Sequence, residues 1–452
     1  MSLLNIHHIH QEYTTPKHFH FWKRGGYSDI YRFYNEILKI IPKFSKDSDT
    51  HKDTIQHTSI TEVAISQFLP RESCFIDCHH IYTNQNSYFI YQDYKGANLL
   101  DWKHKTSLDK RIEAIPSIIY QLLTILLFLE QHGIYYTDLR PCNLLWEYQK
   151  LILIDYSCIS LQYCYKESLQ WTPAIGTWNY AAPEIIFNDT VVSNSIIWSI
   201  GMLICDLLDD YPIQHKYYPK YKIKNTRISW IELLNKIYYQ EQQPIAFSNS
   251  YQSLPEPWKE WIRKMMYWDV NERISKEDLL KIISSTFNPI PLNISFKLTT
   301  SAIPYHRKDY RLKYIDKLYN FSLSVDQEYK VCLTIYIWDL YTPHMDSKNE
   351  INILCAAWLL TGYLMGQYAY DDETTLDLYK HFKTNNKKVY PYIWKIGEKC
   401  YWNLYQKSTD IYLLQHYKCV PWKPFLNFYS QYTEPYSTFQ LSQAFIQSNP
   451  TI

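Results

Sequence analysis

The most constraining feature of this 452-residue sequence is the stretch HGIYYTDLRPCNLLWEYQKLILIDYS, at residues 132–157. Asp138 and Asn143 lie five residues apart in a polar loop that follows a strongly apolar, helix-like segment. Asp155 comes directly after a short strand-like run. Phosphoryl transfer needs a carboxylate to orient the attacking hydroxyl, and oxygen ligands that hold Mg²⁺ against the phosphates. This stretch contains both kinds of group in one loop and at one strand end.

With these residues the sequence resembles the eukaryotic protein kinase family. YTDLRPCN is similar to the catalytic loop of that family, and IDYS is similar to its magnesium-binding turn. The resemblance implies that Asp138 is the catalytic base, that Asn143 and Asp155 are Mg²⁺ ligands, and that Arg140 lies near the γ-phosphate. It also implies ATP and Mg²⁺ as the cofactors.

Three further motifs follow in the order that the family has them. GTWNYAAPEII resembles the end of the activation segment, with Ala182, Pro183 and Glu184 in the signature positions. IIWSIG resembles the buried helix that anchors the large lobe, and MMYWDVNERIS contains Arg273, which in the family pairs with the Glu184 position. One D-x-x-x-x-N pattern alone would be an ordinary turn. Several signals in the right order instead predict an α+β, bilobal protein-kinase fold with a β-rich N-lobe and a helical C-lobe.

The small lobe is more divergent. RGGYSDIY resembles the glycine-rich loop that covers the ATP phosphates, although only Gly25 occupies a family glycine position. Gly26 is offset by one residue, and Ser28 replaces another glycine, which limits how closely the backbone approaches a phosphate. We assign these three residues and Ile30 to ATP binding. In ILKI, Lys39 occupies the place of the lysine that contacts the α- and β-phosphates.

The partner of Lys39 in the family is a glutamate on a helix. Glu62, within the helical pattern TEVAISQFL, is the only glutamate between residues 40 and 70. We therefore expect a Lys39–Glu62 ion pair. The alternative is that Glu62 caps its own helix, because Ser59 and Glu62 have the spacing of a capping box.

The segment YFIYQDYKGANLL resembles the strand and hinge that bind adenine. By this resemblance Tyr91 is the gatekeeper at the back of the pocket. Gln92, Asp93 and Tyr94 form the hinge, whose backbone groups contact the base.

Some family residues are replaced. Thr137 stands where the catalytic-loop arginine normally lies, so a phosphate on the activation segment would lose its usual counter-charge. Activation by phosphorylation at Ser168 or Thr172 is therefore not expected. Ser157 replaces the glycine of the magnesium turn, and Ile196 replaces an acidic residue of the anchoring helix. The chemical groups themselves are retained, so we expect an active serine/threonine kinase; the alternative is a pseudokinase scaffold.

Beyond residue 289 the sequence no longer resembles a kinase. INILCAAWLLTGYLMG has the periodicity of a buried helix, and its small residues Ala356, Ala357 and Gly362 allow close helix approach. This all-α region weakly resembles a cyclin box; the alternative is an unrelated helical extension. A cyclin-like domain in cis would hold the Glu62 helix in place. We divide the chain into an N-terminal tail (1–18), kinase domain (19–288), linker (289–325), all-α domain (326–430) and C-terminal tail (431–452).

The formal net charge is +1, which makes nucleic acid an unlikely partner and a protein substrate the expected one. The apolar stretches at 118–129 and 196–208 are too short to cross a bilayer, and no signal peptide is evident. These features predict no membrane contact and a cytoplasmic or nuclear location. The histidines near the N-terminus, among them His7 and His8, are interpreted as part of a mobile polar tail rather than a metal site.

Overall fold

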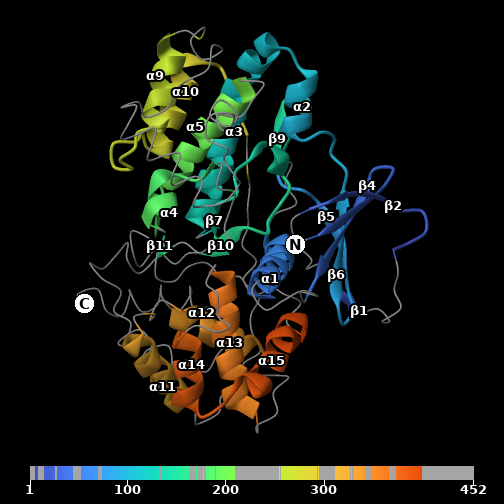
Figure 1. Ribbon diagram of the computed structural model, residues 1–452, viewed down its shortest axis with the longest axis vertical. Coiled ribbons are helices and arrows are strands. Elements are labelled where there is room, and N and C mark those ends of the chain that lie inside the picture. Colours follow the sequence, from blue (N-terminus) through green and yellow to red (C-terminus); the bar gives the residue numbers. More distant parts are fainter. Residues whose placement is uncertain are drawn as a thin grey trace, which may run out of the picture.

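Figure 1 shows the computed structural model of the chain. The structure describes residues 6–8, 15–25, 28–43, 52–69, 74–132, 134–161, 169–170, 177, 180–188, 190–208, 254, 256–292, 294, 311–325, 327, 330–341, 349–365 and 373–399. A β-sheet, a helical lobe and a group of C-terminal helices are arranged around the helix α1 (Lys52–Phe68). The predicted order of a β-rich lobe, a helical lobe and an all-α region is confirmed.

In the described part of the chain, one sheet of six strands forms the small lobe, in the order β1-β5-β6-β4-β3-β2. All neighbouring strands pair antiparallel except β1 and β5. The strands are β1 (Ile6–His8), β2 (His20–Arg24), β3 (Asp29–Phe33), β4 (Glu36–Pro42), β5 (Cys78–Thr83) and β6 (Ser87–Asp93). Side chains alternate between the faces of such strands, so each residue's position in the register decides whether it meets the cleft.

The segment at residues 6–8 differs from the prediction. It was expected to belong to a mobile tail, but it forms β1, and His7 pairs with Tyr82 of β5. A strand of three residues lacks a periodic pattern long enough to be recognised in a sequence. The contact between these segments also spans more than 70 residues of chain, which no local signal reports.

Helix α1 carries Glu62 and begins well before the predicted TEVAISQFL segment. Its residues Ile60, Val63 and Ala64 are buried in the main hydrophobic core. Ser59 lies inside the helix, and its hydroxyl donates to the backbone oxygen of Pro42 at 2.6 Å. The capping-box alternative for Ser59 and Glu62 is therefore wrong, because a cap must lie at the helix start.

The helical lobe follows the sheet. Its elements are α2 (Leu99–Lys105), α3 (Leu108–Gln131), β7 (Ile134–Tyr136), η2 (Pro141–Asn143), β8 (Leu144–Glu147), β9 (Lys150–Leu153), β10 (Ile159–Leu161), β11 (Leu169–Gln170), α4 (Pro183–Asn188), β12 (Thr190–Val191), α5 (Ser195–Leu208), α9 (Glu256–Met265) and α10 (Lys276–Thr286). Helix α5, the predicted anchor, is buried along almost its whole length. The hairpin of β8 and β9 begins directly after Asn143 and ends two residues before Asp155.

Helix α3 is longer than the apolar stretch that was predicted within it. Among the described helices it is the one long and apolar enough to cross a membrane by length and composition. However, 61% of its most apolar window is buried inside the protein. That burial is typical of a core helix, and such a helix passes the same hydropathy test as a membrane span.

The C-terminal helices are α11 (Arg311–Ser324), α12 (Val331–Tyr341), α13 (Glu350–Leu364), α14 (Glu373–Phe382) and α15 (Asn386–Lys399). Helix α11 contacts α12, although its residues were assigned to a linker. Helix α13 is buried at all its residues except Ile351 and Asn352. The part of the predicted all-α domain beyond residue 399 and the predicted C-terminal tail lie outside the described residues.

The C-terminal helices contact the small lobe directly. Helix α13 touches both α1 and β10, and α15 lies near the end of the sheet (Figure 1). Lys43, which follows β4, forms an ion pair with Glu398 of α15 at 2.5 Å, and its ammonium lies 4.5 Å from the centre of the Tyr88 ring. Trp394 of α15 packs against Tyr88, with ring centres 6.1 Å apart. The two parts of the chain thus share an interface of helix contacts, aromatic rings and a partly buried ion pair.

Candidate active site

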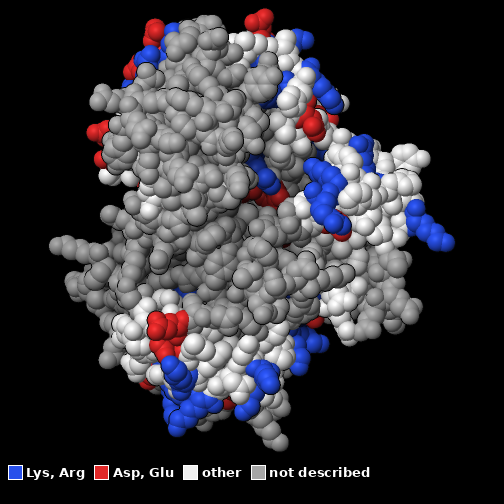
Figure 2. Space-filling view, in the orientation of Figure 1, with Lys and Arg blue, Asp and Glu red and all other residues white. Residues whose placement is uncertain are grey.

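A cleft of about 650 Å³ lies between the sheet and the helical lobe. This volume lies within the range of small-molecule sites in proteins. Figure 2 shows acidic and basic side chains gathered in a hollow between these two parts of the molecule. Most of the predicted site residues line the cleft: Gly25, Ser28, Ile30, Lys39, Gln92, Asp93, Tyr94, Asp138, Arg140, Asn143 and Asp155.

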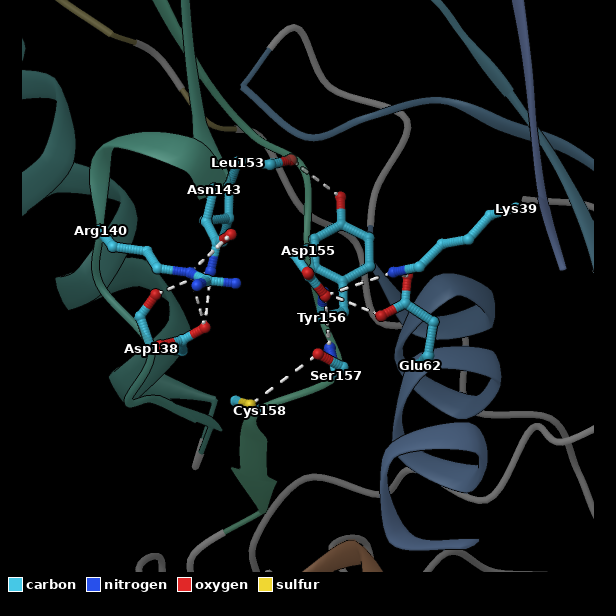
Figure 3. Close-up of polar contacts among 10 residues, drawn as sticks. All are labelled: Lys39, Glu62, Asp138, Arg140, Asn143, Leu153, Asp155, Tyr156, Ser157 and Cys158. Carbon is cyan, nitrogen blue, oxygen red and sulfur yellow. Dashed lines mark hydrogen bonds and ion pairs between the residues drawn. The ribbon is translucent and has the colours of Figure 1, made fainter. Parts of the chain in front are cut away.

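Lys39 joins the sheet to α1 and to the magnesium turn (Figure 3). Its Nζ lies 2.9 Å from Glu62 Oε1 and 3.3 Å from Asp155 Oδ1. The alternation along β4 explains this placement, because Leu38 faces the outer aromatic cluster of the sheet and Lys39 faces the cleft. The side chain of Glu62 is fully buried, and its Oε2 accepts a hydrogen bond of 3.0 Å from the backbone N–H of Tyr156.

Burial and charge act in opposite directions on this triad. Burial alone would lower the pKa of Lys39, but the charges of Asp155 and Glu62 outweigh it and raise that pKa. Burial raises the pKa of Glu62 to about 7, although Lys39 opposes the rise. Burial would also raise the pKa of Asp155, but Lys39 and hydrogen bonds from Ser157 lower it below its usual range. Asp155 therefore stays ionised at neutral pH.

Asp138 is the centre of a second group of hydrogen bonds. Asn143 Nδ2 donates to the Asp138 backbone oxygen at 2.9 Å and to its Oδ2 at 2.8 Å. Arg140 Nε lies 3.2 Å from the same Oδ2. The short helical turn η2 brings these residues together, since Asn143 N–H donates to the backbone oxygen of Arg140. Asp138 is buried and lines the cleft, and these bonds restrict the orientation of its carboxylate.

Thr177 is a site residue that the sequence reasoning missed. Its hydroxyl donates to Asp138 Oδ1 at 2.6 Å, so the activation segment orients one oxygen of this carboxylate and the catalytic loop orients the other. The signal was present, because Thr177 lies in the quoted GTWNYAAPEII motif. Only Ala182, Pro183 and Glu184 of that motif were assigned in advance. Gly176, Ser168 and Thr172 lie outside the described residues.

The structure contradicts the placement of Tyr91 at the back of the pocket. Tyr91 does not line the cleft; its ring packs against Phe19 and Tyr82 on the opposite face of the sheet, with ring centres 5.7 and 5.5 Å apart. Gln92 faces the cleft and is 4% exposed. The register explains the error, because Tyr91 pairs with Leu38 and Gln92 pairs with Ile37. A shift of one residue along a strand exchanges the two faces.

The loop over the cleft is partly described. Gly25 N–H donates to the backbone oxygen of Ser28 at 2.8 Å, so these two residues hold the ends of the loop together. Gly25, Ser28 and Ile30 line the cleft as predicted. Gly26 lies outside the described residues.

Thr137, which stands where the family has an arginine, makes a hydrogen bond of its own. Thr137 donates its hydroxyl to the backbone oxygen of Cys158 at 2.8 Å, and this bond ties the catalytic loop to the segment after the magnesium turn. Below the site, Arg273 donates to both carboxylate oxygens of Glu184 at 2.7 and 2.6 Å. Such a two-bond pair fixes geometry as well as charge. The predicted Arg273–Glu184 pair is therefore formed.

The donor set suits a magnesium ion. Mg²⁺ binds oxygen ligands, and the Asp155 carboxylate and the Asn143 side-chain oxygen are both oxygen donors on residues that line the cleft. Asp155 is ionised because its pKa is lowered, as a ligand to a divalent cation must be. The residues present thus fit the predicted metal.

Comparison with known proteins agrees with this geometry. A family model described as the protein kinase domain matches residues 24–283. The chain is 30% identical over 132 residues to the serine/threonine-protein kinase MAK of Rattus norvegicus, a match covering 29% of this chain and 21% of that protein. It is 31% identical over 132 residues to the serine/threonine-protein kinase ICK of Mus musculus, covering 29% of this chain and 20% of that protein. The matched region thus spans about a fifth of the length of these relatives.

Proposed function

This chain belongs to the protein kinase family, and from that premise we propose that it transfers the γ-phosphoryl group of ATP to serine or threonine hydroxyls of protein substrates. The observation that carries the proposal is the pair of carboxylate groups at the cleft, Asp138 and Asp155, each held by its own set of hydrogen bonds and ion pairs. The serine/threonine preference is supported by the relatives, which are serine/threonine-protein kinases.

Asp138 orients the attacking hydroxyl and accepts its proton. Asn143 and Thr177 each donate to a different carboxylate oxygen of Asp138, and these bonds keep the carboxylate in one rotamer. A fixed carboxylate holds the hydroxyl in line with the phosphorus, and positioning supplies much of the catalysis in phosphoryl transfer.

The cations of the site act on the phosphates. Lys39 is held by Glu62 and Asp155 in the cleft, where it binds the α- and β-phosphates. Arg140, beside Asp138, offsets negative charge on the transferred group. Asn143 and Asp155 would hold Mg²⁺, which supplies charge neutralisation between the phosphates when it is bound. Gln92, Asp93, Tyr94, Gly25, Ser28 and Ile30 enclose the nucleotide.

The test is phosphotransfer from labelled ATP to generic protein substrates such as casein. We expect Asp138→Asn to lower the rate by at least about a hundredfold, because the amide cannot accept the proton. Asp377→Asn is the matched control, since it makes the same change at an exposed residue of α14. Equal signal from wild type and Asp138→Asn would contradict the kinase activity and favour the pseudokinase scaffold.

We further propose that the C-terminal helices regulate the kinase in cis by holding α1. Helix α13 contacts α1, and Lys43 joins the end of β4 to Glu398 of α15. Because Glu62 is on α1, any shift of this helix changes the Lys39–Glu62 pair. This arrangement supports control without phosphorylation of the activation segment, and it is the arrangement that a cyclin-like domain in cis would require.

We place the protein in the cytoplasm or nucleus. Cys142 and Cys355 are thiols and not disulfide partners, which suits a reducing compartment.

A further inference from the structure

The magnesium turn contains a tyrosine, Tyr156, that forms hydrogen bonds with the stretch before β5, with the end of β9 and with α1. Tyr156 follows Asp155 directly, and 1% of its surface is exposed. Its phenol oxygen accepts a hydrogen bond of 2.9 Å from the backbone N–H of Ile76, and it donates one of 3.2 Å to the backbone oxygen of Leu153. We propose that this phenol hydroxyl is a latch that positions Asp155 for metal and phosphate binding, an inference that rests on the proposed kinase function.

The latch connects three segments through one residue. Ile76 lies in the stretch before β5, Leu153 ends β9, and the Tyr156 backbone N–H donates to Glu62 on α1. Figure 3 shows the phenol pointing toward Leu153 while the Tyr156 backbone faces Glu62. A turn that swung Asp155 out of the cleft would have to break all of these bonds together. Phenylalanine in this position would retain the ring packing but neither hydroxyl bond.

Ser157 adds a second restraint on the same turn. Its backbone N–H donates to Asp155 Oδ1 at 3.1 Å, the oxygen that also meets Lys39. The residue has a side chain where the family has glycine, so its backbone has fewer accessible conformations. The two residues that follow Asp155, Tyr156 and Ser157, thus both limit the conformations of the turn.

The obvious alternative is that Tyr156 is only a core residue. The variant Tyr156→Phe distinguishes a latch from an ordinary core residue, because it removes only the hydroxyl. Ile76 N–H also donates to the Leu153 backbone oxygen at 3.1 Å. These two backbone groups keep each other as partners when the hydroxyl is removed, so no buried backbone group is left unsatisfied. We therefore expect the variant to fold with a small change in melting temperature.

The first measurement is amide hydrogen exchange of the full chain without nucleotide. We expect Tyr156→Phe to exchange about tenfold faster than wild type at residues 153–158, the factor set by the loss of about one buried hydrogen bond. The control is Tyr379→Phe, which removes a buried phenol hydroxyl from α14. It should leave exchange at residues 153–158 unchanged.

The second measurement is ATP affinity with Mg²⁺ and with a chelator. In wild type, Mg²⁺ should raise the affinity for ATP by a certain factor. We expect Tyr156→Phe to make this factor about tenfold smaller and to leave the affinity for ATP without metal unchanged. Unchanged exchange and unchanged Mg²⁺ dependence in Tyr156→Phe would overturn the latch even if the wild type is an active kinase. If the wild type transfers no phosphate, the proposed function fails, and hydrogen exchange still decides whether Tyr156 holds the turn.

Discussion

Asp138 and Asp155 both face the cleft, but the groups that hold them come from different parts of the chain. Asp138 is bonded by Asn143 and Arg140 from its own loop, and by Thr177 further along the helical lobe. Asp155 depends on Lys39, which lies 116 residues earlier in the sheet. Lys39 is in turn held by Glu62 on α1, and α1 contacts α13.

This difference indicates where the site is open to control. The contacts of the Asp138 group all lie within the helical lobe, so they form when that lobe folds. The Asp155 group instead joins the sheet to α1, and α1 contacts α13 of the C-terminal helices. A regulator that acts on α1 therefore changes the Asp155 group and leaves the Asp138 group intact.

The largest expected effect comes from removing Lys39, the cation of the Asp155 group. We expect Lys39→Met to lower kcat/KM for ATP by about a hundredfold or more, because the phosphates lose their buried cation and Glu62 loses its counter-charge. Lys281→Met provides the control, since Lys281 is exposed on α10. Steady-state phosphotransfer measures both. A loss of less than threefold in Lys39→Met would mean that the triad does not carry the phosphate contacts.

A second test loosens the Asp138 group. Thr177→Val removes the hydroxyl that donates to Asp138 Oδ1 but keeps the shape of the side chain. We expect kcat to fall about tenfold, the effect of one hydrogen bond to a charged group, with little change in KM for ATP. Thr177→Ser should restore most of the rate. If Val and Ser behaved alike, the hydroxyl would have no part in positioning Asp138.

A third test reaches the Asp155 group through the C-terminal helices. Glu398→Lys places two like charges at the contact with Lys43 and should lower activity several-fold, because repulsion moves α15 away from the end of β4. The double variant Lys43→Glu, Glu398→Lys should recover much of the loss. Asp377→Lys controls for the added charge on an exposed helix face. Full activity in Glu398→Lys would contradict control in cis through this contact.

The smallest expected effect is the pH dependence that Lys43 gives to the unfolding free energy. Burial lowers the pKa of Lys43, although Glu398 opposes that change. Between this lowered pKa and the ordinary value of about 10.4, the unfolded chain binds more protons at Lys43, so stability rises with pH. Relative to Lys43→Met, the unfolding free energy of the wild type should therefore rise as the pH is raised from neutral toward the ordinary lysine pKa. Chemical denaturation measures it, and a pH-independent difference would show that Lys43 titrates normally.

The sequence predicted the site best where its parts are local. Asp138, Arg140 and Asn143 share one short loop, so their order and spacing already describe their geometry. Lys39 and Glu62 were also paired correctly, because the family resemblance supplied a contact that spacing alone does not indicate. Arg273 and Glu184 were matched in the same way.

The errors arose where one residue or a distant contact decides the outcome. Tyr91 and Gln92 are neighbours in a strand, and only the pairing register determines which of them meets the cleft. The pairing of β1 with β5, and the contact of α13 with α1, join segments that are far apart in the chain. Short polar segments and helical periodicity are local patterns, so they do not indicate which distant segment an element contacts.

The burial of α13 also limits how this protein can change over generations. Ala356, Ala357 and Gly362 lie in a helix that meets α12, α14 and α15 as well as α1 and β10. A larger side chain at such a position would be tolerated only with a matching change in a neighbour. Substitutions in α1 and α13 should therefore occur as compensating pairs. A recombination event that exchanged one part of the chain without the other would lose the fit between them.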